Sequence, residues 1–257
     1  MSIKILHVVL SLETGGLENG IVNITNRVDP ARFDMDVLCL RARGELADRI
    51  TRSDSKVIFA PDAGHGILAG AKNVYRACKQ GNYHIVHAHG LATMLASWLG
   101  GRRAHAPIII NGEHGVLYDE SLRRRVLQRW LFNSMDLNLS VSAVLIDDIV
   151  RRIGPRADNF RAIINGVDTE TFKPDDNARQ QIRHQFGFTD ENFIVGSVGR
   201  LVEVKNYPSL VKGFTKLYKN HPQARLVFVG DGDQRQVLEQ LARENNVSDQ
   251  VYFPGRR

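Results

Sequence analysis

Cysteine is scarce in this chain, and long apolar runs are missing. Only two of the 257 residues are cysteines, Cys39 and Cys78, and neither belongs to a Cys-x-x-Cys pair or a Cys/His cluster. A disulfide framework and a cysteine-ligated zinc site are therefore not expected, and a reducing cytoplasm fits best. No stretch reaches the ~18 apolar residues that a membrane-spanning helix needs, so any membrane contact should be peripheral.

Glycine and proline, at 22 and 8 residues, are close to average usage, which argues against a collagen-like or low-complexity chain. Apolar residues make up 43% and charged residues 24% of the sequence, so the chain can bury a sizeable core and is not disordered. At ~150 residues per domain, the length fits one large domain or two modest ones.

Positive charge is in slight excess and unevenly distributed. Residues 1–166 contain 21 Lys and Arg against 16 Asp and Glu, whereas residues 167–257 contain 13 against 12. Arginine clusters at 102–103, 123–129 and 151–156 supply most of the surplus. They could bind anionic lipid, nucleic acid or phosphate, or lie on solvated helix faces. Nucleic-acid binding ranks last because the clusters lack interleaved aromatic residues.

Short apolar runs alternate with longer helical stretches, which is typical of an α/β fold with a parallel sheet covered by helices. Strands are predicted over residues 3–10, 33–40, 56–60, 84–87, 107–111, 137–141 and 162–164, and helices over 16–28, 44–53, 64–80, 91–101, 122–133 and 143–152. Residues 1–166 are therefore predicted to form one Rossmann-like domain.

A second unit is expected after the Asn-Gly turn at 165–166. The proline and paired aspartates that follow predict a linker over residues 167–190. Residues 191–257 are predicted to form the first part of a second Rossmann-like domain. Its predicted strands are 193–198, 224–229 and 250–253, and its predicted helices are 206–220 and 233–245. Three strands and two helices make a poor independent domain, because the last strand would leave an unpaired or apolar edge. We therefore expect either a piece of a longer protein or a unit whose exposed edge is covered by the first domain.

A glycine pair, Gly15 and Gly16, separates the first predicted strand from the first helix. Bare backbone amides at a helix N-terminus suit a phosphate, although a simple tight turn explains a lone pair of glycines about as well. Leu17 occupies the place of the second glycine in the dinucleotide fingerprint, which disfavours an NAD-dependent enzyme.

The second unit repeats this arrangement with charged residues. A predicted strand delivers Gly199 and Arg200 to a loop, and Lys205 follows beside the start of the next helix. Two cations and a helix N-terminus can hold a diphosphate and stabilise its charge as a leaving group. The alternative is that both are ordinary surface charges.

Histidines gather at predicted strand ends in the first domain, where α/β folds bind ligands. His87 and His89 straddle one strand end, but a metal site there is disfavoured because no carboxylate or cysteine lies at ligand spacing. His114, next to Glu113 on a glycine-flanked loop, is the better candidate for hydrogen bonding a polar substrate. The Gly-x-Ser-x-Gly motif of serine hydrolases is absent.

Together these motifs resemble the retaining glycosyltransferases of family 4, which have two Rossmann-like domains in the GT-B fold. The matching segments, in the family's order, are 15–18, 84–90, 113–115, 139–142, 165–168 with 172–174, 198–201 with 205–206, and 228–232. Residues 15–20, Gly-Gly-Leu-Glu-Asn-Gly, also resemble sugar transferases associated with exopolysaccharide gene clusters. The resemblance implies transfer of a sugar from a nucleotide-diphosphate donor to a glycan or lipid-linked acceptor, with retained anomeric configuration and without a metal ion or cofactor.

The resemblance also implies roles for individual residues. Arg200 and Lys205 would bind the donor diphosphate beside Gly199, and His114 would contact the donor sugar as a catalytic-site residue. The glycine pair would border the same phosphates or the acceptor. Further candidates for the substrate cleft are His89, Glu113 and Asn165.

The chain departs from the family in lacking its two-glutamate motif, which holds the donor and follows the region matched here. An inactive remnant, or an interaction module for anionic lipid or polysaccharide, is therefore an alternative to the enzyme. A sugar-nucleotide epimerase of similar fold is disfavoured by the 165–174 segment and the Arg200 to Lys205 spacing. Family members often act peripherally at membranes on lipid-linked acceptors, and the basic first domain would suit that, so we expect a cytoplasmic protein that contacts the inner face of the membrane peripherally.

Overall fold

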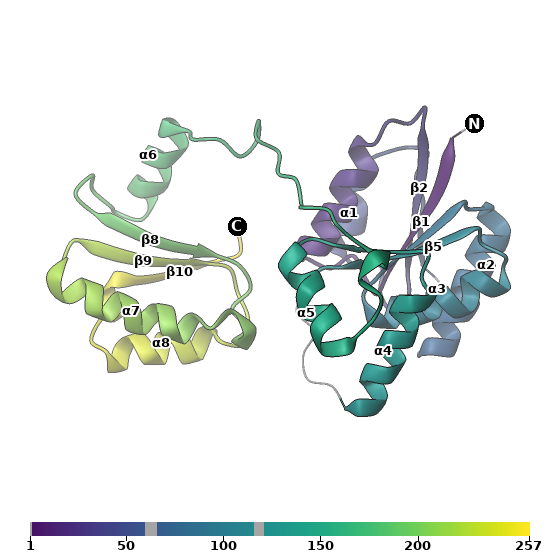
Figure 1. Cartoon of the computed structure of the whole chain (residues 1–257). Coiled ribbons are helices and arrows are strands. Elements are labelled where there is room, and N and C mark those ends of the chain that lie inside the picture. Colours follow the sequence, from purple (N-terminus) through teal and green to yellow (C-terminus); the bar gives the residue numbers. More distant parts are fainter. Residues whose placement is uncertain (1, 60–65, 116–120) are drawn as a thin grey trace. The chain divides into compact units, whose positions relative to one another are not determined.

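The computed structural model describes residues 2–59, 66–115 and 121–257, and the chain divides into two compact units, Met1–Val167 and Asp168–Arg257 (Figure 1). The predicted strand end at Ala60 and helix start at Gly64 lie outside the described residues.

The first unit is a seven-stranded parallel sheet in the order β3-β2-β1-β4-β5-β6-β7. Its strands are β1 (Ile3–Val9), β2 (Phe33–Cys39), β3 (Val57–Phe59), β4 (Ile85–His89), β5 (Ile108–Glu113), β6 (Leu137–Ser140) and β7 (Phe160–Ala162). Its helices are α1 (Gly16–Arg27), α2 (Ile67–Gly81), α3 (Leu91–Arg103), α4 (Leu122–Ser134) and α5 (Ala143–Ile153), with short 3-10 segments at Glu45–Arg49 and Ala157–Asn159.

Alternation along β1 separates the two faces of this sheet. Leu6 and Val8 belong to the larger apolar cluster, which also contains residues of α2, α3, α4 and α5. Val9 packs with Ile21 of α1 in a smaller cluster on the other face. Because successive side chains of a strand point to opposite faces, His7 shares the α1 face with Val9.

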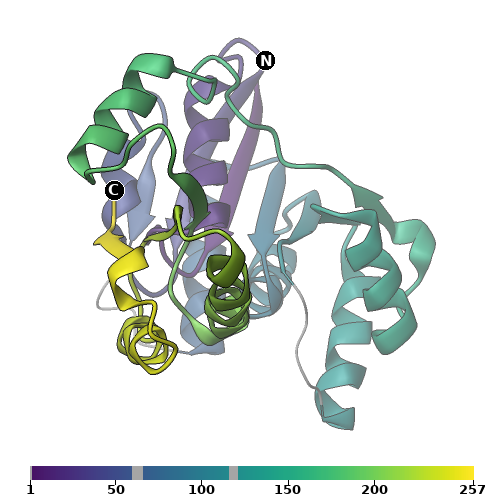
Figure 2. The same cartoon turned by 90° about the vertical axis from the view of Figure 1, so that its left-hand side faces the viewer.

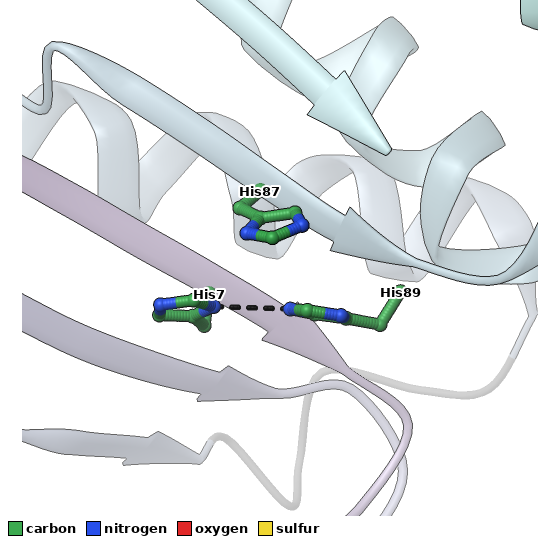
Figure 3. A group of neighbouring side chains, drawn as sticks. All are labelled: His7, His87 and His89. Carbon is green, nitrogen blue, oxygen red and sulfur yellow. Dashed lines mark hydrogen bonds between the residues drawn. The ribbon is translucent and has the colours of Figure 1, made fainter. Parts of the chain in front are cut away.

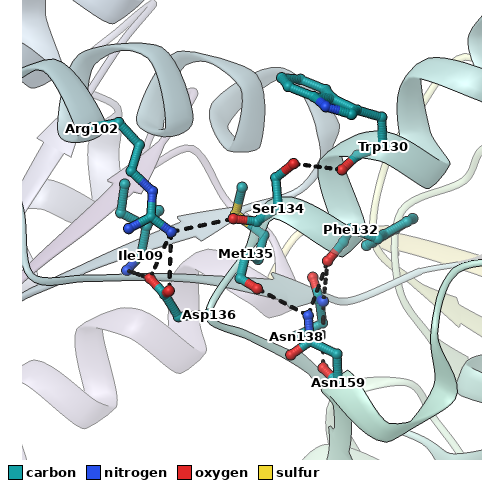
Figure 4. Close-up of polar contacts among 9 residues, drawn as sticks. All are labelled: Arg102, Ile109, Trp130, Phe132, Ser134, Met135, Asp136, Asn138 and Asn159. Atoms are coloured by element: carbon teal, nitrogen blue, oxygen red, sulfur yellow. Dashed lines mark hydrogen bonds and ion pairs between the residues drawn. The ribbon is translucent and has the colours of Figure 1, made fainter.

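A polar network holds the end of α4 against the sheet (Figure 4). Asp136 accepts hydrogen bonds from the Ile109 backbone N–H at 2.7 Å and from the Arg102 guanidinium at 3.0 Å. The side-chain amides of Asn138 and Asn159 donate to the Phe132 carbonyl oxygen at 2.9 and 3.1 Å. The two asparagine side chains thus satisfy a carbonyl group of the last turn of α4, which the helix itself leaves without a partner.

The second unit is a three-stranded parallel sheet in the order β10-β9-β8, formed by β8 (Phe193–Val198), β9 (Ala224–Val229) and β10 (Val251–Gly255). Helices α7 (Tyr207–Asn220) and α8 (Arg235–Glu244) lie together on one face of it (Figure 1, Figure 2). Phe214, Phe228 and Leu238 are fully buried between these elements. Two parallel sheets of unequal size, each with helices, confirm the predicted α/β class.

The helix predicted over 44–53 is wrong, because the chain forms only the 3-10 segment Glu45–Arg49. The side chain of Asn26, in α1, binds the backbone where this segment ends. It donates to the Arg49 carbonyl oxygen at 2.8 Å and accepts from the Thr51 N–H at 3.0 Å. The Arg49 carbonyl oxygen and the Thr51 N–H are thus hydrogen-bonded to a side chain and not to the backbone of a continuing helix. The last strand of the unit is also displaced, to Phe160–Ala162 from the predicted 162–164.

The segment 167–190, expected to be a linker, contains the helix α6 (Asp176–Gln185). Asp175 caps it by accepting a hydrogen bond from the Ala178 N–H at 2.9 Å. No residue of α6 is buried, and Ala178 and Ile182 are its only apolar residues, which is too few to mark a helix in the sequence. Just after it, Phe188 packs edge-on against Tyr252 of β10, with ring centroids 4.8 Å apart.

Candidate functional site

A pocket of about 170 Å³ lies at the carboxyl ends of the central strands of the first unit. The strand order reverses between β1 and β4, and open parallel sheets bind ligands beside such a reversal. The lining residues are His7, Gly16, Leu17, Gly20, Ile21, Ile24, His87, His89, Gly112, Glu113, His114, Leu139, Ser140, Val141, Ile163 and Asn165. Among these described residues there is no lysine or arginine, so the titratable groups of the pocket are imidazoles and one carboxyl.

Four imidazoles meet at this pocket. His7 and His87 are register partners on β1 and β4, and His89 lies two residues further along β4 on the same face. The Nδ1 atom of His7 is 3.0 Å from Nε2 of His89, and Nδ1 of His89 is 3.0 Å from Nε2 of His114 (Figure 3 shows the first of these contacts). A neutral imidazole donates through one nitrogen and accepts through the other. His89 therefore donates to one of its two neighbours, His7 or His114, and accepts from the other.

Burial keeps this array uncharged. It lowers the pKa of His7 to about 4 and lowers the pKa values of His87 and His89 well below the usual value. The pKa of His114 is also lowered by burial. Near pH 7 the imidazoles are therefore neutral and act as hydrogen-bonding groups rather than as cations.

Gly112 makes room for the array, because β5 runs beside β4 and pairs Gly112 with His89. A Cβ atom at this position would lie 2.9 to 3.1 Å from one nitrogen of each of His87, His89 and His114. A side chain here would therefore push three imidazoles out of place.

Gly112→Ala is expected to destabilise the first unit by about 1–3 kcal/mol, as overpacking of a well-packed site does. Both tryptophans of the chain, Trp98 and Trp130, lie in this unit, so urea unfolding followed by tryptophan fluorescence measures the effect. Gly16→Ala is the control, because its added Cβ meets nothing within 4 Å. Equal unfolding midpoints for the two variants would contradict the packing described for Gly112.

Glu113 is the acidic group of the pocket. The residue is 6% exposed, and burial raises the pKa of its carboxyl to about 7. Asn111 opposes this shift, since its side-chain amide donates to Oε2 of Glu113 at 3.3 Å. The carboxyl therefore exchanges its proton near neutral pH and can donate or accept a hydrogen bond there.

A second candidate site lies in the second unit, at the carboxyl end of β8. The Gly199 N–H donates to the Val229 carbonyl oxygen at 2.9 Å, and the loop continues through Arg200 into a 3-10 segment, Glu203–Lys205. Arg200 and Lys205 are both exposed, and within the described residues neither side chain has an ion-pair partner. Two exposed cations without ion-pair partners thus lie, together with Glu203, on the segment that leads into α7.

The loop depends on close backbone packing at Gly230, which follows β9. Its φ is +143°, and a Cβ atom there would lie 1.9 Å from the Gly199 carbonyl oxygen. Gly232 is equally tight, because its Cβ would lie 2.3 Å from the Leu201 carbonyl oxygen. Glycine at both positions therefore lets the loop after β9 lie directly against the loop that carries Arg200.

The structure brings five of the predicted residues into the first-unit pocket, namely Gly16, His89, Glu113, His114 and Asn165. Gly15, the residue before α1, does not line the pocket. The other three, Gly199, Arg200 and Lys205, belong to the second unit.

Sequence reasoning missed His7, which it treated only as part of the first strand. The spacing of polar residues within β1 offers no signal of its own. The alignment of His7 with His87 comes from the pairing of β1 with β4, which are about 80 residues apart in the chain.

Residues 14–171 match the family described as Glycosyltransferase Family 4, and residues 178–257 match Glycosyl transferases group 1. The chain belongs to Glycosyltransferase Family 4. The resemblance expected from the sequence motifs is therefore confirmed at the level of the family.

Two relatives of this family 4 chain extend over most of it. EpsF of Bacillus subtilis (strain 168) is 26% identical over 98% of this chain and 68% of its own length. The UDP-Gal:alpha-D-GlcNAc-diphosphoundecaprenol alpha-1,3-galactosyltransferase of Escherichia coli is 24% identical over 90% of this chain and 62% of its own length. The chain thus spans about two thirds of the length of these relatives.

Solved structures share the fold. Anabaena Alr3699/HepE, solved in complex with UDP and glucose, superposes with a TM-score of 0.83 at 22% identity, covering 99% of this chain and 70% of its own. A glycosyltransferase from Rickettsia africae ESF-5 gives 0.80 at 17% identity, covering 100% and 69%. These likenesses confirm the GT-B fold predicted for this family 4 chain.

Proposed function

We propose that this protein transfers a sugar from a nucleotide-diphosphate donor to a glycan or lipid-linked acceptor, with retention of anomeric configuration and without a metal ion. The observation that carries the proposal is the pair of exposed cations, Arg200 and Lys205, which lie beside the N-terminus of α7 and form no ion pair within the described residues. Two positive charges and the positive end of a helix dipole can neutralise a departing diphosphate.

The first-unit pocket supplies the groups for the sugar and the acceptor. His114 is in position to hydrogen-bond a sugar hydroxyl, and His89 holds its ring through the 3.0 Å contact with Nε2. Glu113, with a pKa of about 7, is suited to pairing with a hydroxyl as donor or acceptor. Gly16, at the start of α1, lines the same pocket, and its backbone amide together with that of Gly15 just before it would border the phosphates or the acceptor.

The relatives support this substrate class. The Escherichia coli relative is named as acting on GlcNAc-diphosphoundecaprenol with UDP-Gal, and the Anabaena neighbour was solved with UDP and glucose. Together with the likeness of residues 15–20 to exopolysaccharide transferases, they favour a lipid-linked acceptor in exopolysaccharide synthesis.

A decisive assay offers the chain a panel of nucleotide sugars with a lipid-linked glycan acceptor, in the presence of a chelator. The proposal predicts one glycosylated product whose new linkage, analysed by NMR, has the anomeric configuration of the donor. An inverted linkage would overturn retention, and loss of turnover on chelation would overturn metal independence. Absence of transfer from every nucleotide sugar would overturn the proposed activity.

Peripheral contact with an anionic membrane is supported by α4. Leu122, Val126 and Trp130 recur every four residues, which places them on one helix face, and they are 75%, 60% and 43% exposed. Exposed arginines accompany this apolar stripe at positions 123, 124, 125 and 129. Within the described residues, no helix is both long and apolar enough to cross a bilayer. An apolar stripe flanked by arginines fits the inner, anionic face of the membrane from the cytoplasmic side.

Replacing Arg123 and Arg129 by Gln should weaken binding to phosphatidylglycerol-containing vesicles about 30-fold, because each basic residue near the surface contributes about 1 kcal/mol. Cosedimentation at low salt measures the change. The matched control replaces Lys212 and Lys216 of α7 by Gln, which removes the same charge from the second unit. An equal loss in both double variants would show that net charge, not α4, governs the binding.

A further inference from the structure

Three imidazoles from two neighbouring strands converge at the bottom of the first-unit pocket. His7, His87 and His89 each offer one nitrogen, and these three atoms lie within 4.8 Å of one another. All three residues line the pocket, and Figure 3 shows His87 next to the hydrogen-bonded pair of His7 and His89. A tetrahedral zinc ion bound at its usual bond length brings ligand nitrogens to about 3.4 Å apart.

Two of these residues have nitrogen atoms without partners. Nε2 of His7 and Nε2 of His87 are buried and accept or donate no hydrogen bond among the described residues. Buried polar atoms are nearly always paired, and an unpaired one needs an explanation such as a bound ion. Two such atoms in one cluster therefore point to a ligand.

The third imidazole is oriented by its neighbour. Nδ1 of His89 contacts Nε2 of His114 at 3.0 Å, so a proton on Nδ1 leaves Nε2 of His89 with a lone pair, which accepts the hydrogen bond from the Nδ1–H of His7 at 3.0 Å. A metal ion would take the place of that shared proton between the two imidazoles. A hydrogen bond from the second nitrogen of a metal-binding histidine is the usual way in which its ring is held. His114 would act here as that outer partner.

We propose that His7, His87 and His89 form a three-histidine site for one divalent transition-metal ion, with the pocket supplying the remaining coordination position. Neutral imidazoles select zinc, cobalt, nickel or copper over magnesium and calcium, which prefer oxygen ligands. Glu113 lines the same pocket and provides an acidic group that a bound dication would draw into its ionised form.

This site goes beyond the proposed transfer reaction and takes no part in neutralising the diphosphate. An ion held here would occupy the bottom of the pocket and fix His89, and through it His114. The backbone leaves space for it, since Gly112 places no side chain among the imidazoles.

The test titrates Co²⁺ into the full chain, purified without a polyhistidine tag, and records the visible absorption. The proposal predicts one equivalent bound, with the intense bands of four-coordinate Co²⁺, and zinc X-ray absorption that indicates three imidazole ligands. Both measurements use the native sequence, so they do not depend on the folding of any variant. Octahedral bands, or no saturable binding, would overturn the proposal and leave a neutral hydrogen-bonded histidine chain.

Variants locate the ion. His87→Phe should weaken Co²⁺ affinity at least about 100-fold, and His114→Ala about 10- to 100-fold as loss of an outer partner. The exposed His184 of α6 serves as the matched control, since His184→Gln should leave affinity unchanged. Tight binding that survives His87→Phe, or that is lost equally in His184→Gln, would place the ion elsewhere and contradict the site.

Discussion

Replacing Arg200 by Ala should lower the rate of sugar transfer about 100- to 1000-fold, as removal of one preorganised donor to a developing negative charge does. The charge on the diphosphate grows as the bond to the sugar breaks, so the loss should fall mainly on kcat. Arg200→Lys should recover part of the rate, because it restores the charge but not the bidentate geometry of the guanidinium.

The control for this prediction is Lys219→Ala. Lys219 and Lys205 are both exposed lysines. Lys219 lies in the last turn of α7, far from the candidate site, whereas Lys205 lies just before the first turn of that helix. Steady-state kinetics with the preferred nucleotide sugar should show normal rates for Lys219→Ala. A rate for Arg200→Ala within twofold of the native chain would remove Arg200 from the reaction.

Glu113→Gln should make the first unit more stable at pH 8 by about 3 kcal/mol while leaving it nearly unchanged at pH 4. The folded chain holds the proton of Glu113 up to a pKa of about 7, whereas the unfolded chain releases it near the ordinary value of 4.5. Between these pH values the folded state binds more protons than the unfolded state. Stability of the native unit therefore falls as pH rises from about 4.5 to 7, and glutamine removes that loss.

Urea unfolding followed by tryptophan fluorescence across pH 4 to 8 measures this difference. The buried histidines give the opposite slope, since their lowered pKa values make stability rise with pH as the unfolded histidines lose their protons. They are common to both chains and cancel when the two profiles are subtracted. Parallel profiles for the native chain and Glu113→Gln would contradict a buried, protonated Glu113.

Local patterns in the sequence predicted where the residues of the second-unit candidate site lie in the fold, while their role in binding a diphosphate stays a prediction. Gly199, Arg200 and Lys205 belong to one continuous strand, loop and helix, so their placement follows from short-range periodicity and turn chemistry. The helix α6 escaped prediction because only two of its residues, Ala178 and Ile182, are apolar, which is too few for a clear helical period.

The first-unit pocket depended on information that no local pattern contains. His7 joins His87 only through pairing of strands far apart in the chain, and Gly112 leaves space that matters only once β4 and β5 lie side by side. The raised pKa of Glu113 comes from burial, so it too required the packed structure. Residue type predicted candidates here, and tertiary contacts determined their chemistry.

Titration of a nucleotide sugar with the chain, followed by phosphorus NMR, tests the central claim most directly, because it observes the donor diphosphate itself. We predict that both phosphorus resonances shift on binding, that the Arg200→Ala, Lys205→Ala double variant abolishes the shift, and that Lys219→Ala retains it. Resonances that do not respond to the native chain, or that respond equally to the double variant, would contradict a diphosphate site at the end of β8.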